Sequence, residues 1–113
     1  MPKRGDVFLA RLNPTEGSEI AGDRPVIVMS RDAINQSSPV VVIVPCTDAD
    51  HKKRIYPSHV VIKPGDGGLT KESVALGEQV RAINTSRFIK QMGTLRTTTL
   101  VQIGVALKIA LDL

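Results

Sequence analysis

The stretch PVVVIVPCT, residues 39–47, is the longest apolar run in the sequence. Its valines and isoleucine are branched at Cβ, which favours an extended backbone over a helix. The run is far too short to span a membrane, because a spanning helix needs about 20 apolar residues. A short apolar run bounded by turn signals is typical of a strand that is buried on both faces. The stretch therefore predicts the central strand of a sheet.

Further short strands are expected on both sides of this one. The segments that predict them are 6–12, 25–30, 58–63, 73–83 and 92–95. The fourth has Gly77 near its middle, which predicts two short strands joined by a bulge or a kink. The segments between the strands are a long polar loop at 13–25, a short helical turn at 31–38 and a turn at 64–68.

The last segment, residues 97–113, has the period of a helix, with Thr97 or Thr98 as its candidate N-cap. Two apolar stripes run along it. One consists of Leu100, Ile103, Leu107, Ala110 and Leu111, and the other of Val101, Val105 and Ile109. Two stripes indicate two partners, the helix's own sheet and another subunit. A single broad core face is the alternative, and the sequence leaves both open.

Short strands, Gly and Pro turns and one terminal helix predict a mainly β fold, with a small, strongly bent antiparallel sheet or barrel. The 113 residues suit a single domain, residues 1–113. A chain of this size buries only about two-thirds of its unfolded surface. We therefore expect a partner subunit to contribute to its stability.

The charge balance is basic. Fifteen Lys and Arg residues oppose eleven Asp and Glu, which gives a net charge of +4 and an isoelectric point near 9.6. This indicates a polyanionic partner, with nucleic acid first, although many small proteins are mildly basic without one. The run His51–Arg54 is accordingly either a solvated face or a patch that tracks a phosphate backbone. The single cysteine and the lack of an apolar leader predict a cytoplasmic protein.

Metal and thiol chemistry have little support. Cys46, His51 and His59 are the only Cys and His residues, and their spacing fits no metal site, so we expect no metal and no cofactor. Cys46 ends an apolar run, which predicts a buried, unreactive thiol. His59 is expected to point from a strand into solvent or a shallow pocket. Tyr56 is the one ring suited to stack on a base.

Three segments, taken in order, resemble the MazF/PemK (Kid) family of ribonuclease toxins from bacterial toxin-antitoxin pairs. They are KRGDVFLARLNPTEGSEIAGDRPVIVMS (3–30), VPCTDAD (44–50) and GEQVRAI (77–83). With the terminal helix, the resemblance runs almost from end to end. Each piece alone is weak, but their order and spacing are specific for so small a domain.

The resemblance implies an SH3-like, highly curved antiparallel sheet with a C-terminal helix, and a homodimer. It also implies metal-independent, sequence-specific cleavage of single-stranded RNA, which inhibits translation and growth. In that reaction the 2′-hydroxyl attacks the adjacent phosphorus and leaves a 2′,3′-cyclic phosphate and a 5′-hydroxyl. The implied protein partner is a cognate acidic antitoxin, and DNA is expected to bind only through that antitoxin.

Two residues carry over from the family as catalytic. Arg24 precedes the proline of the second strand, and its permanently charged guanidinium suits it to stabilise the phosphorane and to act as the acid. Thr47 supplies a hydroxyl that can donate to a nonbridging oxygen or orient the 2′-hydroxyl. Asp23 is expected to set the direction of the arginine. Without the resemblance, a surface ion pair between Arg24 and Asp23 and a strand-end cap at Thr47 are the simpler interpretations.

Four more residues carry over as RNA contacts. Glu19 is expected to accept from a base amino group or to assist proton transfer, and Glu78 matches an acidic residue of relatives. Gln79 is expected to read a base edge, and Arg81 to contact phosphate or brace its strand against an acidic neighbour. A histidine that is a candidate base in one relative has no counterpart in TEGSEIAG (15–22). The base therefore stays open, with Glu19 as the substitute.

Two other functions stay open on the same fold. A gyrase poison resembling CcdB would lack ribonuclease activity and act through its C-terminal helix. A nucleic-acid-binding module would act as a repressor subunit together with the antitoxin. All three functions predict a basic dimer, so charge does not separate them. The presence of both Arg24 and Thr47 favours the enzyme.

Overall fold

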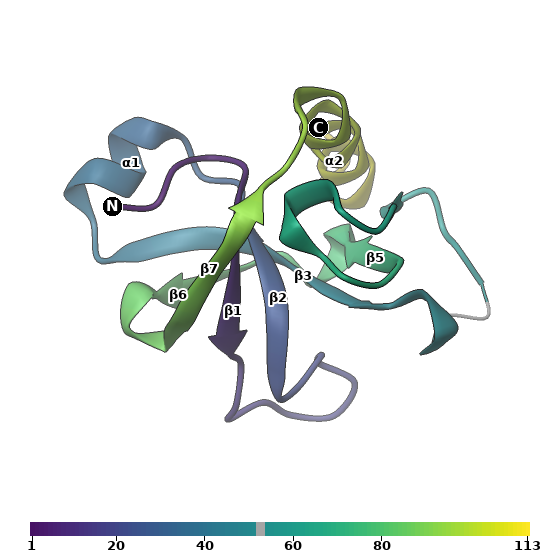
Figure 1. Ribbon diagram of the computed structural model, residues 1–113, viewed down its shortest axis with the longest axis horizontal. Coiled ribbons are helices and arrows are strands. Elements are labelled where there is room, and N and C mark those ends of the chain that lie inside the picture. Colours follow the sequence, from purple (N-terminus) through teal and green to yellow (C-terminus); the bar gives the residue numbers. More distant parts are fainter. Residues whose placement is uncertain (52–53) are drawn as a thin grey trace.

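Strand β3 (Val40–Asp48), formed by the apolar stretch, is the centre of the sheet. The computed structural model describes residues 1–51 and 54–113, and in these ranges seven antiparallel strands form one sheet in the order β4-β5-β3-β2-β1-β7, with β6 also paired to β3 (Figure 1). The other strands are β1 (Asp6–Arg11), β2 (Asp23–Val28), β4 (His59–Ile62), β5 (Ser73–Leu76), β6 (Arg81–Asn84) and β7 (Phe88–Thr94). Helix α1 (Asp32–Ser37) connects β2 to β3, and α2 (Thr97–Leu111) follows β7. The predicted fold, mainly β with a C-terminal helix, is confirmed.

The sheet bends where β3 changes partners. Ile43 of β3 pairs with Arg81 of β6, whereas Cys46 pairs with Ala75 of β5. Between these two pairs β3 advances by three residues, whereas the segment from Ala75 to Arg81 advances by six. The extra residues form turn η3 (Gly77–Gln79). Extra residues on one strand of a pair bend the sheet and increase its twist. The predicted kink between two short strands is confirmed.

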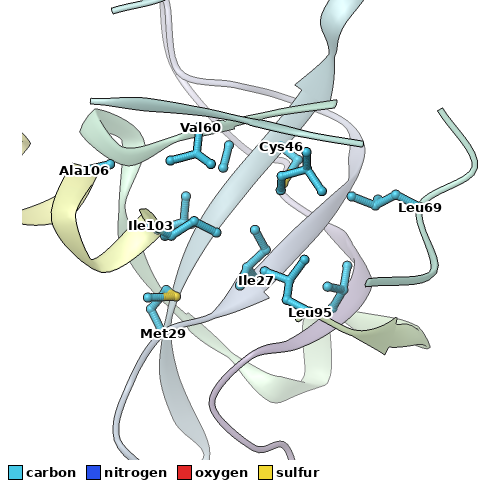
Figure 2. Close-up of a cluster of buried hydrophobic side chains, with 12 residues drawn as sticks. Ile27, Met29, Cys46, Val60, Leu69, Leu95, Ile103 and Ala106 are labelled. Atoms are coloured by element: carbon cyan, nitrogen blue, oxygen red, sulfur yellow. The ribbon is translucent and has the colours of Figure 1, made fainter. Parts of the chain in front are cut away.

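Successive residues of the inner strands face two separate cores, because side chains alternate along a strand. The first core lies against α2, and Figure 2 shows Ile27, Met29, Val60 and Ile103 gathered in it. The second core lies on the other face. Its buried members are Ala10, Leu12, Val26, Val28, Val41, Ile43 and Ile83. The odd or even position of a residue in β2 or β3 thus decides which core its side chain faces.

Cys46 belongs to the first core and is fully buried. Burial raises the pKa of its thiol to about 12, because an apolar surrounding disfavours the charged thiolate. The predicted unreactive thiol is confirmed.

Two strands begin at least two residues before their predicted starts. Strand β2 begins at Asp23 rather than Pro25, because its main chain pairs with β1 as far as Arg11. Strand β7 begins at Phe88, well before the predicted 92–95, because it pairs with β1 along most of its length. In both places polar residues continue a strand whose partner extends beyond the apolar core.

Helix α2 begins at Thr97, but neither Thr97 nor Thr98 caps it. The N-cap is Arg96, and its side chain makes no capping bond. Asp66, from the turn before β5, instead accepts hydrogen bonds from the Arg96 N–H at 2.9 Å and from the Thr99 hydroxyl. The carboxylate that accepts hydrogen bonds at the helix start therefore lies about 30 residues earlier in the sequence. Local sequence patterns do not reveal a contact over this separation.

The two stripes of α2 have different surroundings. Ile103 and Ala106 are buried in the first core. The second stripe consists of Val101, Val105 and Ile109, which are 61%, 52% and 51% exposed. A single broad core face is therefore wrong for this helix. Leu111, predicted to face the core, is also exposed.

Two expectations about the surroundings of the protein have different outcomes. Lys52 and Lys53, the middle of the basic run, lie outside the described residues, so the role of that run stays a prediction. None of the helices in the described part of the chain has the length and apolarity that crossing a membrane requires.

Substitution of the residues that cap α2 should separate the structural cap from the one expected from sequence. Asp66→Ala and Thr99→Ala should each lower the free energy of unfolding by about 1–3 kcal/mol, because each leaves polar groups at the helix start without a partner. Thr98→Ala is the matched control and should change stability by less than about 0.5 kcal/mol. Urea denaturation of the three variants measures these differences. A larger loss for Thr98→Ala than for Thr99→Ala would contradict the described cap.

Candidate functional site

Arg24 and Thr47 lie on neighbouring strands and on the same face of the sheet. The β2–β3 pairing ends with Val26 opposite Pro45, and the same register continued by two residues sets Arg24 opposite Thr47. Both residues share the alternation of Val26 and Ile43, so they lie on the face of the second core. Thr47 is only 6% exposed, whereas Arg24 is half-buried. The register therefore predicts a cross-strand row of Arg24 and Thr47 just beyond the last pair of β2 and β3.

The direction of Arg24 is set by the loop before it. Its Nε donates to the carbonyl oxygen of Ala21 at 2.9 Å. Asp23 was expected to have this role, but it lies on the opposite face of β2 because neighbours in a strand alternate. Among residues 1–51 and 54–113 no ion pair joins the two side chains. With Nε engaged, the two terminal nitrogens of the guanidinium are left to bind another group.

A cavity of about 280 Å³ lies between the β1–β2 loop, residues 12–22, and turn η3. Its lining residues are Ser18, Glu19, Ile20, Glu78, Gln79, Val80 and Arg81. The fold thus brings together all four residues that were predicted to contact RNA. Arg24 and Thr47 are not part of the lining. Arg81 nevertheless pairs with Ile43 and faces the second core, as they do.

Gln79 clamps the β1–β2 loop onto turn η3. Its Oε1 accepts from the Ile20 N–H at 2.6 Å, and its Nε2 donates to the Ser18 carbonyl at 3.2 Å. Both ends of the amide are therefore engaged by the chain itself. The expectation that Gln79 reads a base edge stays a prediction, because the amide keeps one acceptor position and one N–H beyond the two loop bonds.

Two arginines hold the same loop at its beginning. Arg81 Nη1 donates to the Leu12 carbonyl at 3.3 Å, so Arg81 braces the loop rather than an acidic neighbour. Arg87 Nη1 donates to the Asn13 carbonyl at 2.7 Å and to the Arg11 carbonyl at 3.1 Å. Sequence analysis missed Arg87, because no pattern near it indicates that its partners lie more than 70 residues earlier.

Glu78 is held by His59, the first residue of β4, and by Ser58, which precedes it. Ser58 Oγ donates to Oε1 at 3.1 Å, and His59 Nε2 lies 2.8 Å from Oε2. Partial burial acts to raise the pKa of Glu78, but the hydrogen bonds from His59, the backbone and Ser58 outweigh it, so the pKa lies below its ordinary value. Glu78 is therefore a carboxylate at neutral pH.

His59 does not point into solvent, which was one of its two predicted placements. Its side chain is fully buried, and the residue contributes to a cavity between β4 and α2. His59 and Glu78 meet only because β4 pairs with β5, which sets His59 opposite Leu76. Sequence analysis had no signal for this contact, since the two residues are 19 positions apart.

Glu19 lies on the loop and is exposed. Its Oε1 accepts from the Glu16 N–H at 2.6 Å, which closes a tight turn within the loop. The site as a whole therefore has a guanidinium and a hydroxyl on neighbouring strands and two carboxylates beside a small cavity. This arrangement can stabilise a phosphate and accept hydrogen bonds from a neighbouring base. In the described ranges, no three or more Cys, His, Asp or Glu side chains converge as metal ligands would.

Comparison with known proteins gives consistent results. A family model described as a PemK-like, MazF-like toxin of type II toxin-antitoxin systems matches residues 3–111. The chain is 39% identical over 113 residues to the endoribonuclease MazF of Staphylococcus epidermidis, covering 100% of this chain and 93% of that protein. A mycobacterial endoribonuclease solved in complex with its cognate antitoxin has a TM-score of 0.82 at 26% identity, covering 100% of this chain and 97% of that chain. MazF from Deinococcus radiodurans has a TM-score of 0.84 at 24% identity, covering 99% and 97%, and supports the fold alone.

Loss of the Gln79 clamp should loosen the loop without unfolding the sheet. In Gln79→Ala, the Ile20 amide should exchange its hydrogen about five to ten times faster, as expected when a hydrogen bond worth about 1 kcal/mol is lost. Gln91→Ala is the matched control, because Gln91 is an exposed glutamine of β7. Hydrogen exchange followed by NMR measures both variants. Unchanged exchange at Ile20 would show that the amide is protected by something other than Gln79.

Proposed function

Because this chain belongs to the PemK-like, MazF-like toxin family of type II toxin-antitoxin systems and is an endoribonuclease, we propose that it cuts single-stranded RNA at the row formed by Arg24 and Thr47. The proposed reaction needs no metal. The ribose 2′-hydroxyl attacks the adjacent phosphorus, and the products are a 2′,3′-cyclic phosphate and a 5′-hydroxyl. Cutting at short sequence motifs would inhibit translation and growth. We treat residues 1–113 as one toxin domain, since the family match spans residues 3–111.

The register of β2 and β3 is the observation that carries this proposal. A phosphorane needs positive charge and hydrogen-bond donors close to its equatorial oxygens. Arg24 has its Nε fixed by Ala21, so its terminal nitrogens can donate to two oxygens of one phosphate. Thr47, in the same row, supplies a hydroxyl to a nonbridging oxygen or to the 2′-hydroxyl.

The acid and the base have different candidates. Arg24 is assigned the acid role alongside charge stabilisation. An arginine is a poor base because its guanidinium stays protonated. Glu19 is our candidate for the base or for a base-reading contact. One of its oxygens is engaged by Glu16, and the other is not committed to that turn.

The cavity beside the row is our candidate site for a nucleotide next to the cut. Glu78 offers a charged acceptor, which suits a base with an amino group. Arg81 supports the loop and adds positive charge near the RNA backbone. Gln79 is assigned the loop clamp, and its remaining acceptor position and N–H are available to a base edge.

We further propose a homodimer through α2 and β4, a cytoplasmic location, and inhibition by a cognate acidic antitoxin. The exposed stripe of Val101, Val105 and Ile109 supports the dimer, because exposed apolar patches mark interfaces. The net charge of +4 complements an acidic partner. A mycobacterial relative was solved with its cognate antitoxin, which supports the same kind of partner here.

Cleavage of RNA in excess EDTA tests the proposed row. The wild-type protein should cut a mixed-sequence single-stranded RNA at a restricted set of sites. Arg24→Ala should cut the same sites about 100 to 1,000 times more slowly, because the charge opposite the developing phosphorane is lost. Arg24→Lys should lie between the two, since lysine keeps the charge but not the paired donors.

Arg31→Ala is the matched control, because Arg31 is exposed next to α1 and its substitution removes the same charge. Its cleavage rate should equal that of the wild type. Equal rates for Arg24→Ala and Arg31→Ala would contradict the proposed row, and mapping of the 2′,3′-cyclic phosphate ends would independently test the reaction.

The dimer has its own test. Val105→Lys should convert the protein to a monomer in analytical ultracentrifugation, because a charge buried in an interface without a partner is costly. Ile34→Lys is the matched control, since Ile34 is an exposed apolar residue of α1. A wild-type protein that sediments as a monomer, or a Val105→Lys variant that stays dimeric, would contradict this interface.

A further inference from the structure

His59 makes two different hydrogen bonds through its two ring nitrogens. Its Nδ1 accepts from the Tyr56 N–H at 3.1 Å, and its Nε2 lies 2.8 Å from Glu78 Oε2. Because a backbone N–H can only donate, Nδ1 carries no proton, and in the neutral ring the proton is on Nε2. His59 therefore donates to the Glu78 carboxylate and cannot accept from it.

Glu78 is held from one side and open on the other. Ser58 Oγ donates to Oε1, so both carboxylate oxygens have a donor from the start of β4. The Glu78 side chain is nevertheless 43% exposed, and the residue lines the cavity beside the β1–β2 loop. A carboxylate has about four acceptor positions, so it can accept further hydrogen bonds on the cavity side. The lowered pKa of Glu78 agrees with a charged acceptor.

We propose that His59 is a positioning residue for RNA recognition, which fixes the Glu78 carboxylate as an acceptor for a nucleobase amino group in this cavity. Adenine, cytosine and guanine carry such a group, and uracil does not. The bond from Nε2 fixes the orientation of the Glu78 carboxylate. This inference rests on the proposed function, because it requires that RNA enters the cavity.

The same ring has a second, structural role that must be separated from the first. The Tyr56 ring packs edge-on against His59, with centroids 5.3 Å apart and an angle of 76° between the planes. This contact and the bond to Nδ1 hold the chain before β4. Positioning of Glu78 uses Nε2 instead. Substitutions that imitate one nitrogen at a time therefore distinguish the two roles.

Two variants of His59 make this separation. His59→Gln places an amide N–H near the position of Nε2 and keeps the donor to Glu78. His59→Asn places a carbonyl near the position of Nδ1 and keeps only the acceptor for Tyr56. The probe is a single-stranded RNA that the protein cuts, made with a 2′-deoxynucleotide at the cut position so that binding is measured without reaction.

We expect His59→Asn to bind this RNA about ten times more weakly than the wild type, as the loss of a hydrogen bond to a charged group predicts. His59→Gln should bind within about twofold of the wild type on the same reasoning. Glu78→Gln should lose as much as His59→Asn, and His59→Asn should cause no further loss when Glu78 is already Gln. Replacing the recognised base by uracil should also remove the difference between the two His59 variants.

Glu72→Gln is the matched control, because Glu72 is 45% exposed and pairs with Lys63 at 3.1 Å outside the cavity. Its affinity should equal that of the wild type. Ser58→Ala removes the other donor to Glu78 without opening a core. Ser58→Ala should also lower the affinity for this RNA. The test therefore stays decisive if a His59 variant does not fold.

Equal losses for His59→Gln and His59→Asn, or wild-type binding by Glu78→Gln, would overturn the inference. Arg24→Ala distinguishes this failure from a failure of the proposed function. If Arg24→Ala abolishes cleavage while Glu78→Gln binds RNA normally, only the role of His59 and Glu78 is wrong. If Arg24→Ala cuts as the wild type does, the proposed catalytic row is wrong as well.

Discussion

The exchange of pairing partners along β3 is the constraint on which the rest of the structure depends. The first half of this strand pairs with β6 while β2 runs beside its middle, and its last residues pair with β5. Buried backbone groups must be hydrogen-bonded, so a central apolar strand can change neighbours only where a turn absorbs the mismatch. Turn η3 does this, and it thereby brings Glu78 and Gln79 out of the ladder and towards the β1–β2 loop. One irregularity in the sheet both curves the fold and creates the cavity of the site.

The loop beside this cavity is held mainly by side chains that point at its backbone. Gln79, Arg81 and Arg87 together engage carbonyl or amide groups from Arg11 to Ile20. Their partners are main-chain groups, so the sequence of the loop can vary without loss of these bonds. Of the loop side chains, Glu19 and Asn13 bond to the loop's own backbone.

Much of the fold could be predicted from the sequence, because its strands are short apolar runs separated by Gly and Pro turns. The central strand, the kink and the terminal helix all follow from local composition and period. The proposed catalytic pair required the family resemblance, since neither Arg24 nor Thr47 stands out in a chain with many charged residues. The Asp66 cap, the clamp by Gln79 and the contact between His59 and Glu78 could not be predicted, because each joins residues that only the sheet brings together. Long-range polar contacts leave no periodic signal in a sequence.

The alternation along β3 also determines how the protein responds to reactive molecules in the cell. Cys46 directly precedes Thr47, yet its thiol points into the opposite core, is fully buried and has a pKa raised to about 12. Peroxides and alkylating agents react with accessible thiolates, and the only cysteine of this chain provides none. We therefore expect that oxidants do not modify the ribonuclease through its cysteine. The thiol of Cys46 stays unmodified in its core, and the hydroxyl of Thr47 lies on the other face of the sheet.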